Sequence, residues 1–131
     1  MKTRRTRKQK TRISRGGSNT NITYDSIKVE GQLLTKSITA VQPSIKIPEN
    51  HFIIMYDPDA PVGTFLHWLT NSRETYVPYS PPSPPKGVHR YIFKLVKGSP
   101  LEIPSERVID VTAILGAQPV IWTKYFRVAA N

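Results

Sequence analysis

The fold is decided by residues 52–69, which read FIIMYDPDAPVGTFLHWL. Two continuous apolar runs, Phe52–Tyr56 and Phe65–Leu69, enclose a segment that holds two prolines and two aspartates. Apolar runs of this length, bounded by proline and glycine, are typical of buried strands. Because each proline fixes its own φ and restricts the residue before it, the segment between the runs is predicted to be a rigid turn.

Further strands are predicted on both sides of this segment. After it, long runs rich in aromatic and β-branched residues cover 90–96 and 120–128. Before it, shorter stretches in which apolar and polar residues alternate occur at 22–24, 27–29 and 44–47. Alternation with a period of two is the pattern of a strand with one buried face.

Only a single short helix is predicted. Asp110 is a good N-cap, residues 111–115 are apolar enough to pack, and Gly116 is suited to end the helix. The chain has 12 prolines, five of which fall within residues 78–85, and this cluster predicts a fixed loop. An all-β, β-dominated domain is therefore expected.

The positive charge of the chain is concentrated at one end. A length of 131 residues is that of one ordinary domain, and the formal net charge is +10. Residues 1–18 contain eight Lys and Arg and no acidic residue, whereas residues 19–131 contain eleven basic and nine acidic residues. We predict that 1–18 is a basic disordered tail and that 19–131 is the folded β domain.

Composition also excludes several classes of function. The chain has no cysteine, so disulfides, thiolate metal sites and thiol nucleophiles are absent. None of the short motifs of serine hydrolases, P-loop nucleotide hydrolases or zinc proteases occurs, so an ordinary enzyme is not expected. No apolar run approaches the roughly 20 residues of a membrane-spanning helix, and an intracellular, soluble protein is predicted.

Polar residues at three predicted strand ends form a candidate pocket. Asp57 and Asp59 follow the first apolar run, His67 lies in the second, and His89 and Tyr91 begin the third. Histidine N–H and tyrosine O–H groups suit an oxyanion such as phosphate. Two readings remain open beside this one: a metal site built from the aspartates and histidines, and a structural role for the buried histidines.

Four motifs carry a resemblance to a known family. They are DPDAP at 57–61, His67-Trp68, PPKGVHRY at 84–91, and LGAQPV at 115–120 with Phe126 after it. In this order they resemble the phosphatidylethanolamine-binding protein (PEBP) family, over roughly residues 22–128. The resemblance implies a PEBP-like antiparallel β-sandwich with one or two short helices.

The resemblance also implies a function. The expected activity is the non-enzymatic binding of anionic phosphoryl ligands, such as phosphate or a phosphatidylethanolamine head group, in a small pocket at the strand ends, with no metal or other cofactor. The bond between Ala60 and Pro61 is expected to be cis. The implied ligand-binding residues are Asp57, Asp59, Pro61, His67, Ser83 (through its backbone N–H), Pro84, His89 and Tyr91.

Two other functions stay open at this stage. The loop from Pro61 to His67 is shorter than is common in the family, and Pro81 replaces a frequent glycine, which favours a protein-interaction regulator of kinase or protease type with a vestigial pocket. Residues 1–18 favour a binder of nucleic acid or anionic membrane. A basic segment ending in Gly16-Gly17 on so compact a chain resembles homologues in giant DNA viruses, which would place the protein in the host cytoplasm or the virion.

Overall fold

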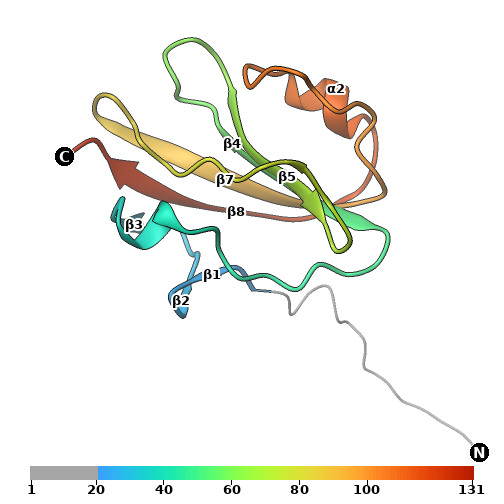
Figure 1. The fold of residues 1–131 in the computed structure, drawn as a ribbon, viewed down its shortest axis with the longest axis horizontal. Helices are drawn as coiled ribbons and strands as arrows, with labels where there is room; N and C mark the ends of the chain where they lie inside the picture. The colour runs from blue at the N-terminus through green and yellow to red at the C-terminus, as the bar shows by residue number, and fades with distance from the viewer. Residues whose placement is uncertain (1–20) are drawn as a thin grey trace, which may run out of the picture.

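A computed structural model describes residues 21–131, so the predicted basic tail lies outside the described residues. The described chain is dominated by strands, which confirms the predicted β class (Figure 1). The strands are β1 (Thr23–Tyr24), β2 (Ile27–Lys28), β3 (Leu33–Leu34), β4 (His51–Asp57), β5 (Phe65–Asn71), β6 (Thr75–Val77), β7 (Val88–Lys97) and β8 (Val120–Ala129). A short 3₁₀ turn covers Ile38–Ala40, and the helix α2 covers Val111–Leu115.

Six of the strands form one sheet, in the order β3-β8-β7-β4-β5-β6. The long strands β4, β5, β7 and β8 pair antiparallel, as predicted, whereas β3 pairs parallel with β8, so the sheet is mixed. The predicted sandwich is not confirmed, because the second sheet consists of β1 and β2 alone, with two residues each.

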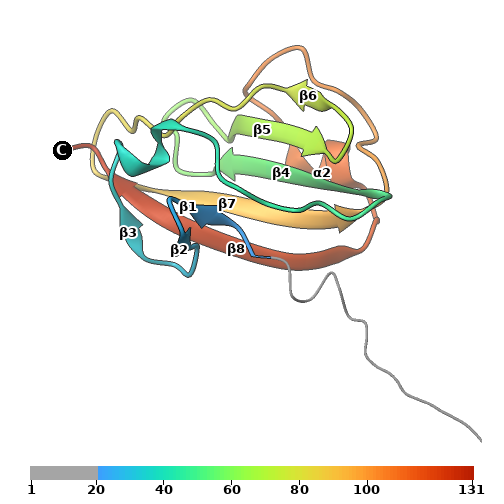
Figure 2. The same ribbon diagram turned by 60° about the horizontal axis from the view of Figure 1, so that its bottom comes forward.

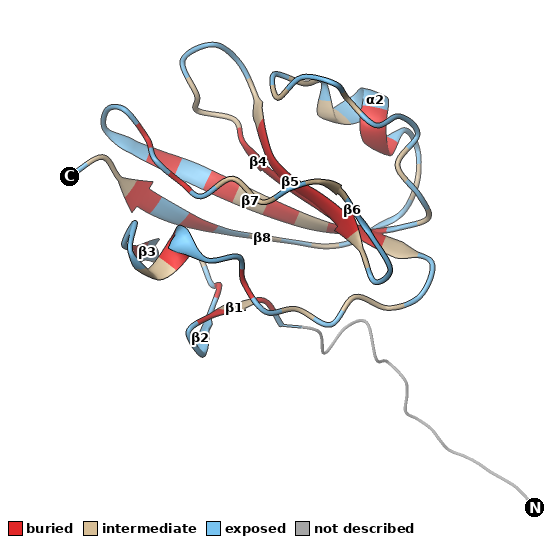
Figure 3. Ribbon diagram, in the orientation of Figure 1, coloured by how far each residue is buried: buried red, intermediate tan, exposed pale blue. Residues whose placement is uncertain are grey.

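The sheet carries a hydrophobic core on each face. The central strand β4 is buried almost throughout, as its continuous apolar run requires, whereas β7 alternates between buried and more exposed residues (Figure 3). One core lies between the sheet and the N-terminal segment that contains β1 and β2, and it includes Tyr91, Phe93 and Phe126. The other lies beneath α2 and includes Phe52 and Ile54 (Figure 2).

The predicted helix and its two caps are confirmed. The Asp110 carboxylate accepts a hydrogen bond from the backbone N–H of Thr112 at 3.0 Å. At the other end, Gly116 adopts a positive φ of 56° and donates its N–H to the carbonyl of Thr112 at 2.8 Å. Ile114 and Leu115 are the residues that α2 buries against the sheet.

Two local predictions are wrong. Residues 44–47 form no strand: only Ser44 pairs, in an isolated bridge with Thr23. Within residues 21–131 no peptide bond is cis, so the bond between Ala60 and Pro61 is trans.

In the same part of the chain, no helix has the length and apolar character needed to cross a membrane.

Candidate functional site

A cavity of about 250 Å³ lies where three long strands meet. Because β5 and β7 both run antiparallel to β4, the last residues of β4 lie beside the first residues of its two neighbours. Seven of the eight predicted site residues line this cavity, and Asp59 does not. The seven are Asp57, Pro61, His67, Ser83, Pro84, His89 and Tyr91.

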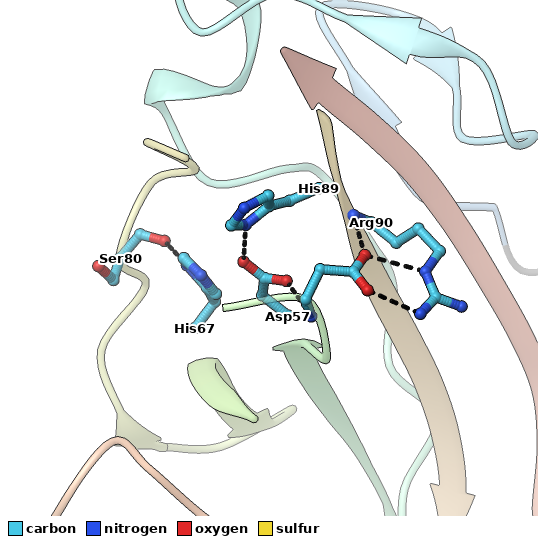
Figure 4. A network of polar contacts seen from close by, with 6 residues as sticks. Asp57, His67, Ser80, His89 and Arg90 are labelled. Carbon is cyan, nitrogen blue, oxygen red and sulfur yellow. Dashed lines mark hydrogen bonds and ion pairs between the residues drawn. The ribbon is translucent and has the colours of Figure 1, made fainter. Parts of the chain in front are cut away.

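Asp57 and His89 form a buried pair at the cavity (Figure 4). The Nδ1 atom of His89 lies 2.7 Å from Oδ2 of Asp57, and their side chains are only 8% and 4% exposed. The other carboxylate oxygen accepts the backbone N–H of Asp59 at 2.7 Å. Both oxygens of Asp57 are therefore engaged, and the contact fixes the hydrogen of His89 on Nδ1 and orients the ring.

His67 is anchored in the same way, by a backbone carbonyl. Its Nδ1 lies 2.6 Å from the carbonyl oxygen of Ser80, which can only accept, so the hydrogen of the neutral ring is on Nδ1. Ser80 in turn donates its N–H to the carbonyl of His67 at 2.8 Å. Burial lowers the pKa of His67 below its ordinary value of 6.5; the Ser80 carbonyl and Asp57 oppose this shift, and the nearby Arg107 adds to it.

Three polar atoms remain open in this arrangement. Within residues 21–131, the Nε2 atoms of His67 and His89 and the hydroxyl of Tyr91 accept or donate no hydrogen bond, and none of the three is fully enclosed. The Tyr91 ring meets His67 edge-on at 5.1 Å and stacks on His89 at 6.5 Å. Burial and the neighbouring carboxylates raise the pKa of Tyr91, so its hydroxyl keeps its proton at neutral pH.

Asp59 lies outside the cavity, where it binds Arg90. Its carboxylate accepts from Nε of Arg90 at 2.9 Å, from Nη2 at 2.8 Å and from the backbone N–H at 2.9 Å. These hydrogen bonds lower the pKa of Asp59 below its ordinary value of 3.8. Asp59 therefore positions the start of β7 and does not face a ligand in the cavity.

Three further residues contribute to the site without having been predicted. Phe65 forms part of the cavity wall, and Ser80 both lines it and anchors His67. The guanidinium of Arg107 donates to the carbonyl of Leu66 at 2.9 Å and lies 6.0 Å from the centre of the Phe65 ring. Arg107 holds β5 from a loop that follows β7, and no local sequence pattern marks it.

The geometry supplies no ligand set for a metal. Across residues 21–131, no three or more acidic, histidine or cysteine side chains are grouped so that they could hold an ion. What the cavity presents is two anchored imidazoles and one phenol.

No protein-family model matches the chain.

Proposed function

We propose that the cavity binds an anionic phosphoryl group, as free phosphate or as a head group such as phosphoethanolamine, and that it catalyses no reaction. The observation that carries the proposal is the anchoring of both imidazoles through Nδ1, which leaves both Nε2 atoms and the Tyr91 hydroxyl unbonded at one cavity. Three donors that converge on one site suit the several acceptor oxygens of a phosphoryl group.

The anchoring has a consequence for protons. With hydrogen on Nδ1, a neutral imidazole offers only a lone pair at Nε2, which would repel an anion. His67 and His89 therefore donate to a phosphoryl oxygen only when each also carries a proton on Nε2. Burial lowers the pKa of His67, so binding of the anion is coupled to uptake of a proton by this ring.

The surrounding charges are compatible with an anion. The carboxylate of Asp57 would repel a phosphoryl group, but it is paired with His89, whose protonated form neutralises it. Arg107 adds a positive charge close to His67. A volume of about 250 Å³ is below that of pockets for larger organic ligands and accommodates a head group better than a whole lipid.

The test is a titration with phosphate and with phosphoethanolamine, followed through the ring signals of the three histidines in NMR spectra. Saturable shifts at His67 and His89 are expected. His51 is the internal control, because its Nδ1 is engaged with the carbonyl of Glu49 at a distance of 2.7 Å and it does not line the cavity. Equal shifts at all three histidines, or none, would contradict the proposal and favour the alternative of a protein-interaction surface.

Substitutions sharpen the same experiment. His67→Leu and Tyr91→Phe each remove a donor, and each is expected to weaken phosphate binding by about tenfold, the effect of losing one hydrogen bond to a charged group. His51→Leu is the matched control and should bind like the parent. Sulfate, which stays doubly charged as the pH is lowered, should bind more tightly at lower pH, since donation from Nε2 needs a second proton on the imidazole. A pH-independent affinity would argue against donation by the imidazoles.

A further inference from the structure

A second surface lies on the sheet away from the cavity. The helix α2 and its flanking loop cover β4, β5 and part of β7, where Val96 is buried and Ile92 packs against the same core, but β8 stays largely uncovered on that face (Figures 1 and 3). Because Tyr91, Phe93 and Phe126 point into the opposite core, their neighbours along each strand point to this uncovered side. The residues concerned, which we name the β7–β8 face, are Arg90, Ile92, Lys94, Thr123, Tyr125 and Arg127.

The cross-strand register arranges these residues in three rows. Arg90 lies opposite Arg127, Ile92 opposite Tyr125, and Lys94 opposite Thr123. Successive rows on one face of a strand are about 6.6 Å apart, so Arg127 and Lys94 lie in rows about 13 Å apart with Tyr125 in the row between them. A single aromatic ring is therefore flanked by cations along the strands.

The charge of this face is positive. Neither β7 nor β8 contains an acidic residue. Arg90 is paired with Asp59, but Lys94 and Arg127 have no carboxylate partner among residues 21–131; Lys94 donates to Thr123 and Arg127 to the carbonyl of Gly31. Tyr125 is 42% exposed.

The first described residue lies near β8. Asn21 lines a hollow of about 310 Å³ together with Thr123 and Tyr125. Residues 1–18, which contain eight Lys and Arg, precede it in the sequence.

We propose that the β7–β8 face binds single-stranded nucleic acid, with Lys94 and Arg127 at phosphates and Tyr125 stacked on a base. This activity is separate from phosphoryl binding in the cavity. A second copy of the chain is disfavoured as the occupant, because the two faces would bring like charges together. An exposed aromatic ring near cations that have no carboxylate partner among residues 21–131 is the arrangement with which sheets bind unpaired bases, whereas a duplex keeps its bases stacked and out of reach of the ring.

The test uses the full chain and a fluorescent oligothymidine of about 12 nucleotides, with binding followed by anisotropy at several salt concentrations. Tyr125→Leu is expected to weaken binding about tenfold, and Tyr125→Phe, which keeps the ring, to leave it unchanged. Lys94→Gln and Arg127→Gln should each reduce the slope of log affinity against log salt by about 0.7. Lys46→Gln is the matched control, because Lys46 lies on the segment that borders a different hollow.

Three results would overturn the proposal. The first is that Tyr125→Leu and Tyr125→Phe bind equally well and that Lys94→Gln leaves the slope of log affinity against log salt unchanged. This result would assign all binding to residues 1–18. The second is equal affinity for the single strand and for its duplex. The third is Tyr125-dependent binding to phosphatidylserine–phosphatidylcholine vesicles without such binding to the oligonucleotide. Thermal unfolding of each variant checks that it is folded. Phosphate bound in the cavity should not compete with the oligonucleotide for the β7–β8 face. Failure of the nucleic-acid proposal is therefore distinguishable from failure of the cavity proposal.

Discussion

Asp57 and Asp59 are two residues apart, yet they belong to different environments. Asp57 ends β4 with its side chain 4% exposed and holds His89, whereas the side chain of Asp59 is 29% exposed and holds Arg90, which is 51% exposed. Their partners, His89 and Arg90, are adjacent on β7 and point to opposite faces of the sheet. The end of β4 with the turn that follows it is thus joined to the start of β7 twice, once inside the molecule and once at its surface.

The difference teaches which contact the site depends on. A buried carboxylate that loses its partner leaves unsatisfied groups in a medium that cannot replace them, whereas water substitutes readily for an exposed pair. Asp57 and His89 should therefore determine the geometry of the cavity, and Asp59 with Arg90 should contribute little to it. Substitutions of Asp57 and Asp59 test this ranking, and the dependence of stability on the protonation of His67 is expected to lie between them in size.

The largest effect is expected for Asp57→Ala. The substitution leaves the Nδ1–H of His89 and the backbone N–H of Asp59 without their acceptor, so the free energy of unfolding should fall by about 2–4 kcal/mol in urea unfolding. Phosphate binding should be lost with it. Asp57→Asn, whose amide oxygen can still accept a hydrogen bond, is the control and should cost less stability. Equal losses for the two variants would show that charge, not hydrogen bonding, holds the pair.

A smaller effect concerns His67 and pH. Its pKa is lowered in the folded state, so at pH values below 6.5 the unfolded chain binds more protons than the folded one at this residue. This contribution therefore makes stability fall as the pH decreases through 6.5, and the fall ends below the folded pKa. In His67→Gln the free energy of unfolding should decrease less between pH 7.5 and 5.5. Parallel pH profiles for parent and variant would mean that burial of this ring carries no proton linkage.

The smallest effect is expected for Asp59→Asn. Because the pair with Arg90 is largely in contact with water, its loss should lower the thermal midpoint only slightly, and the difference from the parent should vanish at high salt. The pKa of Asp59 is lowered, so the contribution of the pair is present above pH 3.8 and is lost as the pH falls further. A loss as large as that of Asp57→Ala would contradict the predicted difference between the two pairs.

The long elements of the fold were predictable because each carries a strong pattern. The apolar runs that became β4, β5, β7 and β8 needed no tertiary information, and Asp110 with Gly116 marked both ends of α2. The strands β3 and β6 have two and three residues, too few to show a period of two, and only their pairing partners create them. Residues 44–47 show the opposite case, in which an alternating pattern forms a bridge and no strand.

The site was predictable to a similar degree. Motif spacing identified His67, His89 and Tyr91, and the structure brings them to one cavity. Asp59 was expected beside Asp57, but the tight turn after β4 directs it toward Arg90. Arg107 could not be found, because its contact with β5 spans about 40 residues of sequence and follows from how a loop packs.

The edges of the sheet bear on how the protein resists aggregation. On one side of the sheet, the outward backbone groups of β5 are satisfied by β6, Ser80 and Arg107. On the other side, the partners of β8 are β3, Gly31 and Gln32, and they reach only its last part. Among the described residues, the outer edge of β8 near Thr123 is therefore unpaired and could accept a strand from another molecule. An extra residue, Ile121, bulges from β8 just before this stretch, and Lys124 adds a charge directly after Thr123. The bulge shortens the unpaired stretch and Lys124 places a charge beside it, and both features oppose the addition of a strand from another copy of the chain at this edge.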